Sequence, residues 1–356
     1  MTTQTAIYLD SDVCRWHFDR VDLTCDRFCD VTKFINATNQ RKIAMFHIPY
    51  PYEESGEGEK FERRIDAVLD CCERIIILAS ELHDITVDFV KRYQHEKIEY
   101  MICGSFRDLP YHGWMDWFIS TTYFYKYNQV KPLDRLHPYS PKPKYFDCLL
   151  GMPKSHRNIL CNYIVENQFT DRILLTYLGH PRRIIEGENT DGWFWEADGL
   201  EVIDKDLKWT VSQVKYYGQQ MSLSQVVPID VYNQTAYSIV AETNFQNHYS
   251  FYTEKLVKPV LGRRLFLAFG SQYYLKNLRS LGFKTFDGII DESYDQVEDF
   301  EERGKLICEQ IKYLLEQDQQ TILDQVRPIA EHNFELLMQT DWLEESTNVL
   351  RRLTGF

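Results

Sequence analysis

The sequence predicts an α/β protein with two parallel-sheet domains that face each other across a cleft, followed by carboxy-terminal helices. Three observations predict this class. The 356 residues correspond to about two domains of typical size. Short apolar runs recur along the chain, and amphipathic helical segments separate several of them. Strands that alternate with helices form parallel sheets, whose ligands usually bind at the carboxyl ends of the strands.

Continuous apolar runs of strand length mark the expected strands. They are Ala6–Leu9, Ile43–His47, Arg74–Ala79, Ile98–Cys103, Cys148–Leu150, Ile173–Tyr177, Tyr237–Ala241 and Leu265–Phe269. Apolar side chains at helical spacing predict helices between strands and after them. The helical segments are Glu59–Glu73, Asp84–His95, Ser155–Gln168, Glu298–Gln317 and one or two helices within Thr321–Arg352.

A proline-rich segment marks the expected domain junction. Residues 127–153 contain five prolines, and proline blocks both helices and central strands. We therefore expect an amino-terminal domain over residues 1–140, a second domain over 141–318 and closing helices over 319–356. The polar, Trp-rich segment Gly187–Trp209 is expected to be a long loop or a small insertion.

Charge is distributed unevenly along the chain. The net charge of −13 argues against a general nucleic-acid-binding protein. Residues 291–318 hold ten acidic and three basic residues, a net charge of −7, whereas residues 131–158 hold six basic and two acidic residues, a net charge of +4. A basic centre within an acidic protein indicates one small anionic ligand rather than a polymer.

Neither a membrane span nor a metal or disulfide framework is expected. The longest apolar runs, such as Ile75–Ala79, are far shorter than the about 20 residues that cross a bilayer, and the sequence begins without a basic-then-apolar leader. These features predict a cytoplasmic protein. The nine cysteines are scattered and form no C-x-x-C motif, which favours free thiols.

The most informative segment joins a strand to a helix. The strand Tyr237–Ala241 runs into Glu242, and a helix is expected to begin near Thr253, a favourable N-cap residue. The helix amino terminus would attract a phosphate through its free N–H groups and its dipole. Lys255 would add a positive charge, and Glu254 would accept hydrogen bonds from ribose hydroxyls.

This order of residues resembles a known family. Glu242, a gap, Tyr252-Thr253-Glu254-Lys255, an apolar helix and an apolar strand that ends at Gly270 are similar to the donor-binding segment of fucosyltransferase-like and exostosin-like glycosyltransferases of the GT-B type. A second piece, residues 144–150 followed by Ser155-His156-Arg157, is similar to the start of their nucleotide-binding domain. Residues 282–286 and 291–295 resemble glycosyltransferase-like proteins of large phages and viruses, which would place the protein in the host cytoplasm.

The resemblance implies a glycosyltransferase with two Rossmann-like domains in the GT-B arrangement. Residues 1–140 would form the acceptor domain and residues 141–318 the nucleotide-sugar-binding domain. It implies transfer of a sugar from a nucleoside-diphosphate sugar to the hydroxyl of an acceptor, which is a glycan, a protein or a modified DNA base. The transfer would invert the anomeric centre without a metal, with Arg157 and Lys255 neutralising the departing diphosphate and Glu254 holding the ribose. The remaining residues of the implied donor site are Ser155, Glu242, Tyr252 and Thr253.

The general base is expected in the amino-terminal domain, where a carboxylate or histidine would accept the proton of the acceptor hydroxyl. Glu81 and His83, which follow the strand Arg74–Ala79, are the first candidates. Glu53 and Glu54 are the second candidates.

Two features depart from the family pattern. Pro259 removes a backbone donor, so the helix after Lys255 is expected to be short or kinked. Glu242-Thr243-Asn244 stands where fucosyltransferases have Glu-Asn-Ser, so the sequence does not define the sugar.

Three alternatives remain open. The enzyme would act on a modified nucleic-acid base, as phage-type relatives do, or the chain would be a non-catalytic binding protein with the same fold. A third possibility is a metal site at Asp10-Ser-Asp12, which copies the Asp-x-Asp motif of the other large glycosyltransferase class. Only nine residues precede Asp10, too few to build the nucleotide-binding sheet that comes before this motif.

Overall fold

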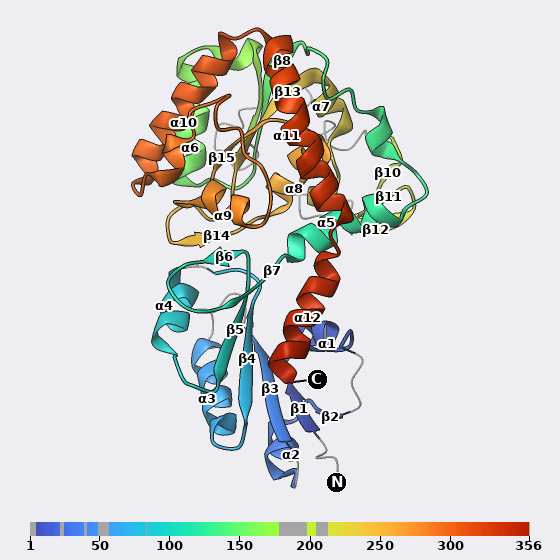
Figure 1. Ribbon diagram of the computed structural model, residues 1–356, viewed down its shortest axis with the longest axis vertical. Coiled ribbons are helices and arrows are strands. Elements are labelled where there is room, and N and C mark those ends of the chain that lie inside the picture. The colour runs from blue at the N-terminus through green and yellow to red at the C-terminus, as the bar shows by residue number, and fades with distance from the viewer. Residues whose placement is uncertain are drawn as a thin grey trace. The chain divides into compact units, whose positions relative to one another are not determined.

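The computed structural model describes residues 5–21, 25–38, 41–48, 57–82, 84–177, 198–203 and 213–355. The chain is a mixed α/β protein with parallel sheets, as the sequence predicts (Figure 1). It divides into two units by the contacts within each. The first unit comprises residues 1–116 and 341–356, and the second comprises residues 117–340. Among the described residues, no helix combines the length and the apolar character that a membrane span requires.

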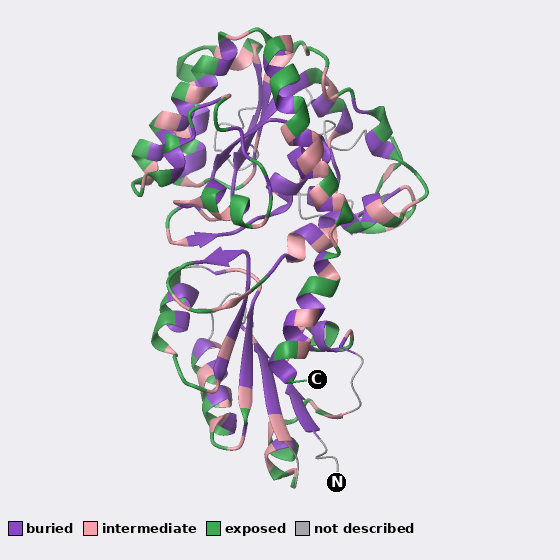
Figure 2. Ribbon diagram, viewed as in Figure 1, coloured by how far each residue is buried: buried purple, intermediate pink, exposed green. Residues whose placement is uncertain are grey.

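The first unit contains a six-stranded parallel sheet. Its strand order is β2-β1-β3-β4-β5-β7. The strands β2 and β3 lie on opposite sides of β1, so the order in which the chain adds strands changes direction there, between β1 and β3. The central strands are buried on both faces, which explains why they are continuous apolar runs in the sequence (Figure 2). The strands are β1 (Thr5–Leu9), β2 (Asp26–Phe28), β3 (Arg41–His47), β4 (Arg74–Ala79), β5 (Ile98–Cys103) and β7 (His112–Trp114), with the short β6 (Ser105–Phe106) between the last two.

The helices of the first unit come from both ends of the chain. Its last helix, α12 (Trp342–Thr354), returns to the sheet, where Arg41 and Arg74 donate hydrogen bonds of 2.6 Å to the carbonyl oxygens of Thr354 and Leu353. Arginine charges also interact favourably with the carboxyl end of a helix. The other helices are α1 (Asp12–Phe18), α2 (Val31–Asn36), α3 (Glu57–Leu69) and α4 (Asp84–Arg92).

The second unit contains a four-stranded parallel sheet of order β15-β13-β8-β9. Because β9 lies on one side of β8 and the later strands lie on the other, the direction of chain travel changes between β8 and β13. A small antiparallel sheet, β10-β11-β12, belongs to the same unit. The strands are β8 (Lys144–Leu150), β9 (Ile173–Tyr177), β10 (Leu200–Val202), β11 (Gln213–Tyr216), β12 (Gln219–Ser222), β13 (Thr235–Ala241), β14 (Tyr249–Ser250) and β15 (Phe266–Phe269).

Helices cover this second sheet. The helix α6 (Ser155–Glu166) follows β8, and α8 (Glu254–Leu261) follows β13 and β14. As expected from Pro259, α8 is short, with eight residues. The other helices are α5 (Asp116–Tyr127), α7 (Ile229–Gln234), α9 (Tyr274–Ser280), α10 (Phe300–Leu315) and α11 (Gln319–Gln339).

A buried ion pair fixes the interior of the second sheet. Arg264 Nη2 lies 2.8 Å from Asp147 Oδ1, and both side chains are at most 5% exposed. Arg264 also donates to Ser238 Oγ and to the carbonyl oxygens of Tyr232, Thr235 and Tyr237. The pair therefore ties β8 to β13 and to the chain that enters β15.

The unit boundaries differ from the expected ones. The change from the first unit to the second falls at residues 116 and 117 rather than near residue 140, and residues 341–356 join the first unit instead of closing the second. The prolines lie within the second unit, where Pro132–Arg135 forms a short 3-10 helix before β8. Most of the segment Gly187–Trp209 lies outside the described residues.

Candidate functional site

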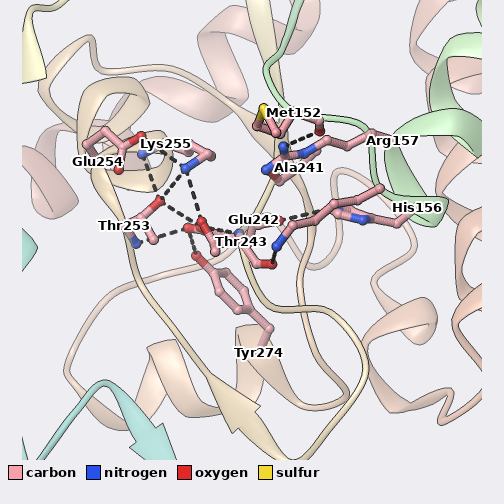
Figure 3. Close-up of polar contacts among 11 residues, drawn as sticks. Met152, His156, Arg157, Ala241, Glu242, Thr243, Thr253, Glu254, Lys255 and Tyr274 are labelled. Atoms are coloured by element: carbon pink, nitrogen blue, oxygen red, sulfur yellow. Dashed lines mark hydrogen bonds and ion pairs between the residues drawn. The ribbon is translucent and has the colours of Figure 1, made fainter. Parts of the chain in front are cut away.

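The candidate site lies at the carboxyl ends of β8 and β13, where the second sheet changes its direction of chain travel. Parallel sheets bind ligands at such positions because the loops that follow the two strands separate there. Residues 151–154 lead from β8 into α6, and residues 242–253 lead from β13 into α8. Figure 3 shows the side chains of both loops around the end of β13.

The amino terminus of α6 is unusual in its charge and its capping. The N-cap residue, Lys154, makes no side-chain hydrogen bond to the helix, and the first turn contains no acidic residue. Arg157 lies in that turn and is only 4% exposed. The first N–H groups of a helix have no partner within the helix, and the helix dipole repels positive charge at this end. This terminus therefore has the features of an anion site.

Arg157 is held by backbone carbonyl groups. Its Nη1 donates to the Met152 carbonyl oxygen over 2.7 Å, and Nη2 approaches the Ala241 carbonyl oxygen at 3.5 Å. Its Nε atom is buried and has no hydrogen-bond partner among the described residues. Burial lowers the pKa of Arg157, and the nearby Tyr177, Glu242 and Glu254 oppose that effect. The guanidinium is therefore a desolvated cation whose Nε–H has no acceptor among the described residues.

The amino terminus of α8 supplies a second cation. Thr253 is its N-cap, with Oγ1 accepting from the Lys255 backbone N–H over 3.2 Å, as predicted. Lys255 Nζ lies 3.0 Å from Glu254 Oε1 and 3.2 Å from Thr243 Oγ1. Its side chain is 27% exposed, so the ammonium group can reach a ligand in solution.

Glu254 is more enclosed than the ribose-binding role implies. Its side chain is 9% exposed and pairs with Lys255. Burial acts to raise the pKa of Glu254, but the charges of Lys255 and Lys258 outweigh it, so the pKa is lowered. The carboxylate is thus ionised near neutral pH and holds the Lys255 ammonium group in place.

Glu242 is an anchor for the loop that follows β13. It is completely buried, and its carboxylate accepts hydrogen bonds from Tyr274 Oη at 2.8 Å, from Thr253 Oγ1 at 2.7 Å and from two backbone N–H groups. Burial raises the pKa of Glu242, and Lys255 and Thr253 oppose this. These protein donors surround the carboxylate, so its effect on a ligand passes through Thr253 and Lys255 (Figure 3).

The remaining predicted donor-site residues occupy different environments. Tyr252 is 1% exposed, and its hydroxyl donates to the Tyr274 carbonyl oxygen. Its ring lies in the core, 4.9 Å from the Tyr274 ring. Ser155 is the first residue of α6, so its backbone N–H is one of the donors at the candidate anion site.

The sequence missed four residues that shape the site. Lys154 Nζ donates to the Thr243 carbonyl oxygen over 2.6 Å and so joins the two loops. Tyr274 donates a hydrogen bond to Glu242, and Thr243 accepts one from Lys255. The exposed Met152 supplies the carbonyl oxygen that accepts from Arg157. Lys154 directly precedes the motif Ser155-His156-Arg157, so the sequence could have identified it as a site residue. Tyr274 lies 32 residues after Glu242, and no local pattern connects them.

The predicted general bases belong to the first unit. Glu81 follows β4, as expected, and is partly exposed. His83, Glu53 and Glu54 lie outside the described residues, so their roles stay predictions.

The Asp-x-Asp motif has other partners. Asp10 accepts a hydrogen bond from Tyr8 and pairs with Arg64, and Asp12 pairs with Arg15. Among the described residues, no group of three or more His, Cys, Asp or Glu side chains is arranged to hold a metal ion.

The chain matches no protein-family model, no curated protein and no solved structure. The functional argument therefore depends on the geometry of the site and on the sequence resemblance.

Proposed function

We propose that the protein is a GT-B type glycosyltransferase that transfers a sugar from a nucleoside-diphosphate sugar to an acceptor hydroxyl, with inversion and without a metal. The observation that carries the proposal is the first turn of α6. There, an uncapped helix terminus coincides with the buried, incompletely bonded Arg157 at the point where the sheet changes its direction of chain travel. A diphosphate would satisfy the helix N–H groups and Arg157 together.

Lys255 would contribute the second positive charge. Its three N–H groups already contact Glu254, Thr243 and Thr253. The two threonine hydroxyls are neutral, and a charge-assisted bond to a phosphate oxygen is stronger than a bond to a hydroxyl. Exchange of a threonine contact for a phosphate contact would keep the Glu254 ion pair intact.

This arrangement suits the departure of a diphosphate. The acceptor hydroxyl oxygen would form a bond to the anomeric carbon while the bond from that carbon to the diphosphate oxygen breaks. The electron pair of the broken bond remains on the diphosphate, and the hydroxyl proton passes to a base, for which Glu81, His83 and Glu54 are the predicted candidates. One preorganised donor at the atom that gains charge is worth about 100- to 1000-fold in rate.

A thermal-shift panel tests the donor site first. UDP, GDP, ADP and inorganic pyrophosphate are added to the full chain in EDTA, and a ligand at 100 times its Kd stabilises a protein by about 2.7 kcal/mol. We expect stabilisation by at least one nucleoside diphosphate and none by the corresponding nucleoside. No shift with any diphosphate would contradict the proposed site.

Turnover tests the reaction. Sugar nucleotides of the base that binds best are incubated with the protein, and release of the nucleoside diphosphate by transfer or slow hydrolysis is followed in EDTA. Binding without any release would favour a non-catalytic binding protein. Competition by DNA with a steep salt dependence would favour the nucleic-acid alternative.

A further inference from the structure

Two consecutive cysteines lie in the turn between α3 and β4. Cys71 is partly exposed, whereas Cys72 is 3% exposed, and both are free thiols. Their backbone N–H groups donate to the Val68 carbonyl oxygen over 3.2 Å and 3.0 Å, and Cys71 Sγ donates to the same oxygen over 3.4 Å. The last turn of α3 therefore fixes the backbone of both residues and the position of the Cys71 thiol.

The pair lies at the edge of the first sheet that is opposite to the predicted general bases. The strand β4 begins at Arg74, two residues after Cys72, and ends at Ala79, two residues before Glu81. A β-strand rises about 3.3 Å per residue, so this strand places about 20 Å between the pair and the edge where ligands of parallel sheets bind. The pair is therefore separate from the acceptor side of the proposed transferase.

The two thiols interact with each other and with two lysines. Burial raises the pKa of Cys72, and Cys71 raises it further through its charge and a side-chain hydrogen bond. The charges of Lys42 and Lys97 oppose this increase because they favour the thiolate. The Cys72 thiol is thus protonated near neutral pH, but it lies close to a second thiol and to two positive charges.

Backbone carbonyl groups hold both lysines. Lys97 Nζ donates over 2.9 Å to the carbonyl oxygen of Leu69, the last residue of α3, and Lys42 Nζ donates over 2.6 Å to that of Ile35. An ammonium group has three N–H donors. Each lysine can therefore keep its carbonyl contact and also stabilise a negative charge on the sulfur atoms.

A disulfide between these two neighbours is unfavourable. Consecutive Cα atoms are about 3.8 Å apart across a trans peptide. Disulfide-bonded residues usually have Cα atoms about 4.4–6.8 Å apart, and departures from this geometry strain the bond. The pair is therefore better suited to hold one atom between its sulfurs than to form a bond between them.

The type and the number of ligands favour Cu(I). Thiolate sulfur is a soft ligand that selects Cu(I), Zn(II) and iron–sulfur clusters. Structural zinc sites and iron–sulfur clusters use four protein ligands. Within the described part of the chain, no third His, Cys, Asp or Glu side chain completes a metal site with the pair. Two sulfur ligands match Cu(I), which is stable in two-coordinate thiolate complexes.

We propose that Cys71 and Cys72 bind one Cu(I) ion as a two-coordinate dithiolate. Each thiol releases its proton to solvent and each sulfur forms one bond to the ion, so nothing is oxidised or reduced. Two thiolates and one Cu(I) carry a single net negative charge, which Lys42 and Lys97 offset. The ion takes the place of the thiol hydrogens and enters at the partly exposed Cys71, so the site needs no separate cavity.

The test is the transfer of Cu(I) to the reduced full chain under anaerobic conditions. Cu(I) is supplied as its bicinchoninate complex, and the loss of absorbance of this complex measures the transfer. We expect a tightly held Cu(I) that excess Zn(II) does not displace. No transfer of Cu(I), or its displacement by Zn(II), would overturn the proposal.

Cysteine variants locate the ion. Cys71→Ser and Cys72→Ser should each weaken Cu(I) binding by more than about 100-fold, because loss of even an outer partner of a metal ligand costs about 10- to 100-fold. The matched control, Cys29→Ser, removes an exposed cysteine and should bind as wild type does. Since Cys71 is partly exposed, Cys71→Ser should also keep the wild-type midpoint of urea unfolding. Unchanged Cu(I) affinity of Cys71→Ser would refute the assignment.

The charge of the complex and the protection of the thiols are tested separately. Lys97→Met should weaken Cu(I) binding by about 10-fold, whereas Lys60→Met at an exposed position of α3 should not. In wild type, bound Cu(I) should protect Cys71 from iodoacetamide and leave Cys29 reactive, as measured by mass spectrometry. Equal affinities of the two lysine variants, or protection of Cys29 instead of Cys71, would contradict the proposed complex.

Discussion

Replacement of Arg157 by methionine separates ligand binding from folding. In the ligand-free protein, the variant loses the bonds to the Met152 and Ala241 carbonyl oxygens. Hydrogen bonds to charged groups contribute about 1.5–3 kcal/mol each, and the 3.5 Å contact lies at the weak end. Against this loss, methionine relieves the desolvation of a buried cation, which costs several kcal/mol, and about 0.3–1 kcal/mol of dipole repulsion. We expect the free energy of unfolding to stay within about 1.5 kcal/mol of wild type.

With ligand, the two proteins are expected to differ. At 100 times the wild-type Kd for pyrophosphate, wild type gains about 2.7 kcal/mol. If the loss of Arg157 weakens binding about 100-fold, the variant gains only about 0.4 kcal/mol, so the ligand-dependent difference is about 2.3 kcal/mol. For a unit of this size, that difference corresponds to about 5–9 °C in Tm.

The assay is thermal unfolding in EDTA with and without pyrophosphate. The matched control is Arg172→Met, which removes an arginine that also donates to a backbone carbonyl, that of Leu315. Arg172 precedes β9 and so lies at the opposite, amino-terminal edge of the second sheet. The control should keep the full pyrophosphate shift. If Arg157→Met also keeps the full shift, the assignment of the anion site to α6 is refuted.

Three further predictions use other charged groups. Lys255→Met should weaken pyrophosphate binding by about 10-fold or more, measured by calorimetry. The double variant Glu254→Gln/Lys255→Met, which also removes the carboxylate that pairs with Lys255, is measured alongside, and Lys305→Met at an exposed position of α10 should bind normally. Equal affinities of Lys255→Met and wild type would contradict a role for Lys255. Asp147→Asn should lower the free energy of urea unfolding by about 3–5 kcal/mol, because Arg264 remains buried without its counter-charge, and a loss below about 1 kcal/mol would show that the pair is dispensable. Burial raises the pKa of Asp116 to about 6, so between about pH 4 and pH 6 the folded chain holds a proton that the unfolded chain has released. Over this range, the free energy of unfolding of wild type should therefore fall by up to about 3 kcal/mol relative to that of Asp116→Asn. Urea unfolding at several pH values measures this difference, and a difference that does not change with pH would contradict the burial of Asp116.

Local patterns predicted the buried central strands and the helix cap, whereas short strands such as β2, β7 and β10–β12 were not predicted. The strands Arg74–Ala79, Ile98–Cys103 and Ile173–Tyr177 have the predicted bounds, because a fully buried parallel strand is a continuous apolar run. Thr253 caps α8 as predicted, since an N-cap depends on residues one to three positions away.

Long-range contacts were not predictable in the same way. Glu242 is buried under Tyr274, and Asp147 pairs with Arg264, over separations of 32 and 117 residues. The end of α12 bonds to Arg41 and Arg74 of the first sheet, over separations of 313 and 279 residues. Local periodicity contains no information about such partners, so the sequence identified candidate ligand residues but did not show that Glu242 and Tyr252 are enclosed by protein.

A crystal structure of the protein with UDP or GDP, whichever stabilises it more, in the presence of EDTA tests the central claim most directly. We predict the diphosphate at the first turn of α6, with its oxygens within hydrogen-bond distance of the Ser155 backbone N–H, the Arg157 guanidinium and Lys255 Nζ. A nucleotide bound elsewhere, with these three groups unchanged, would contradict it.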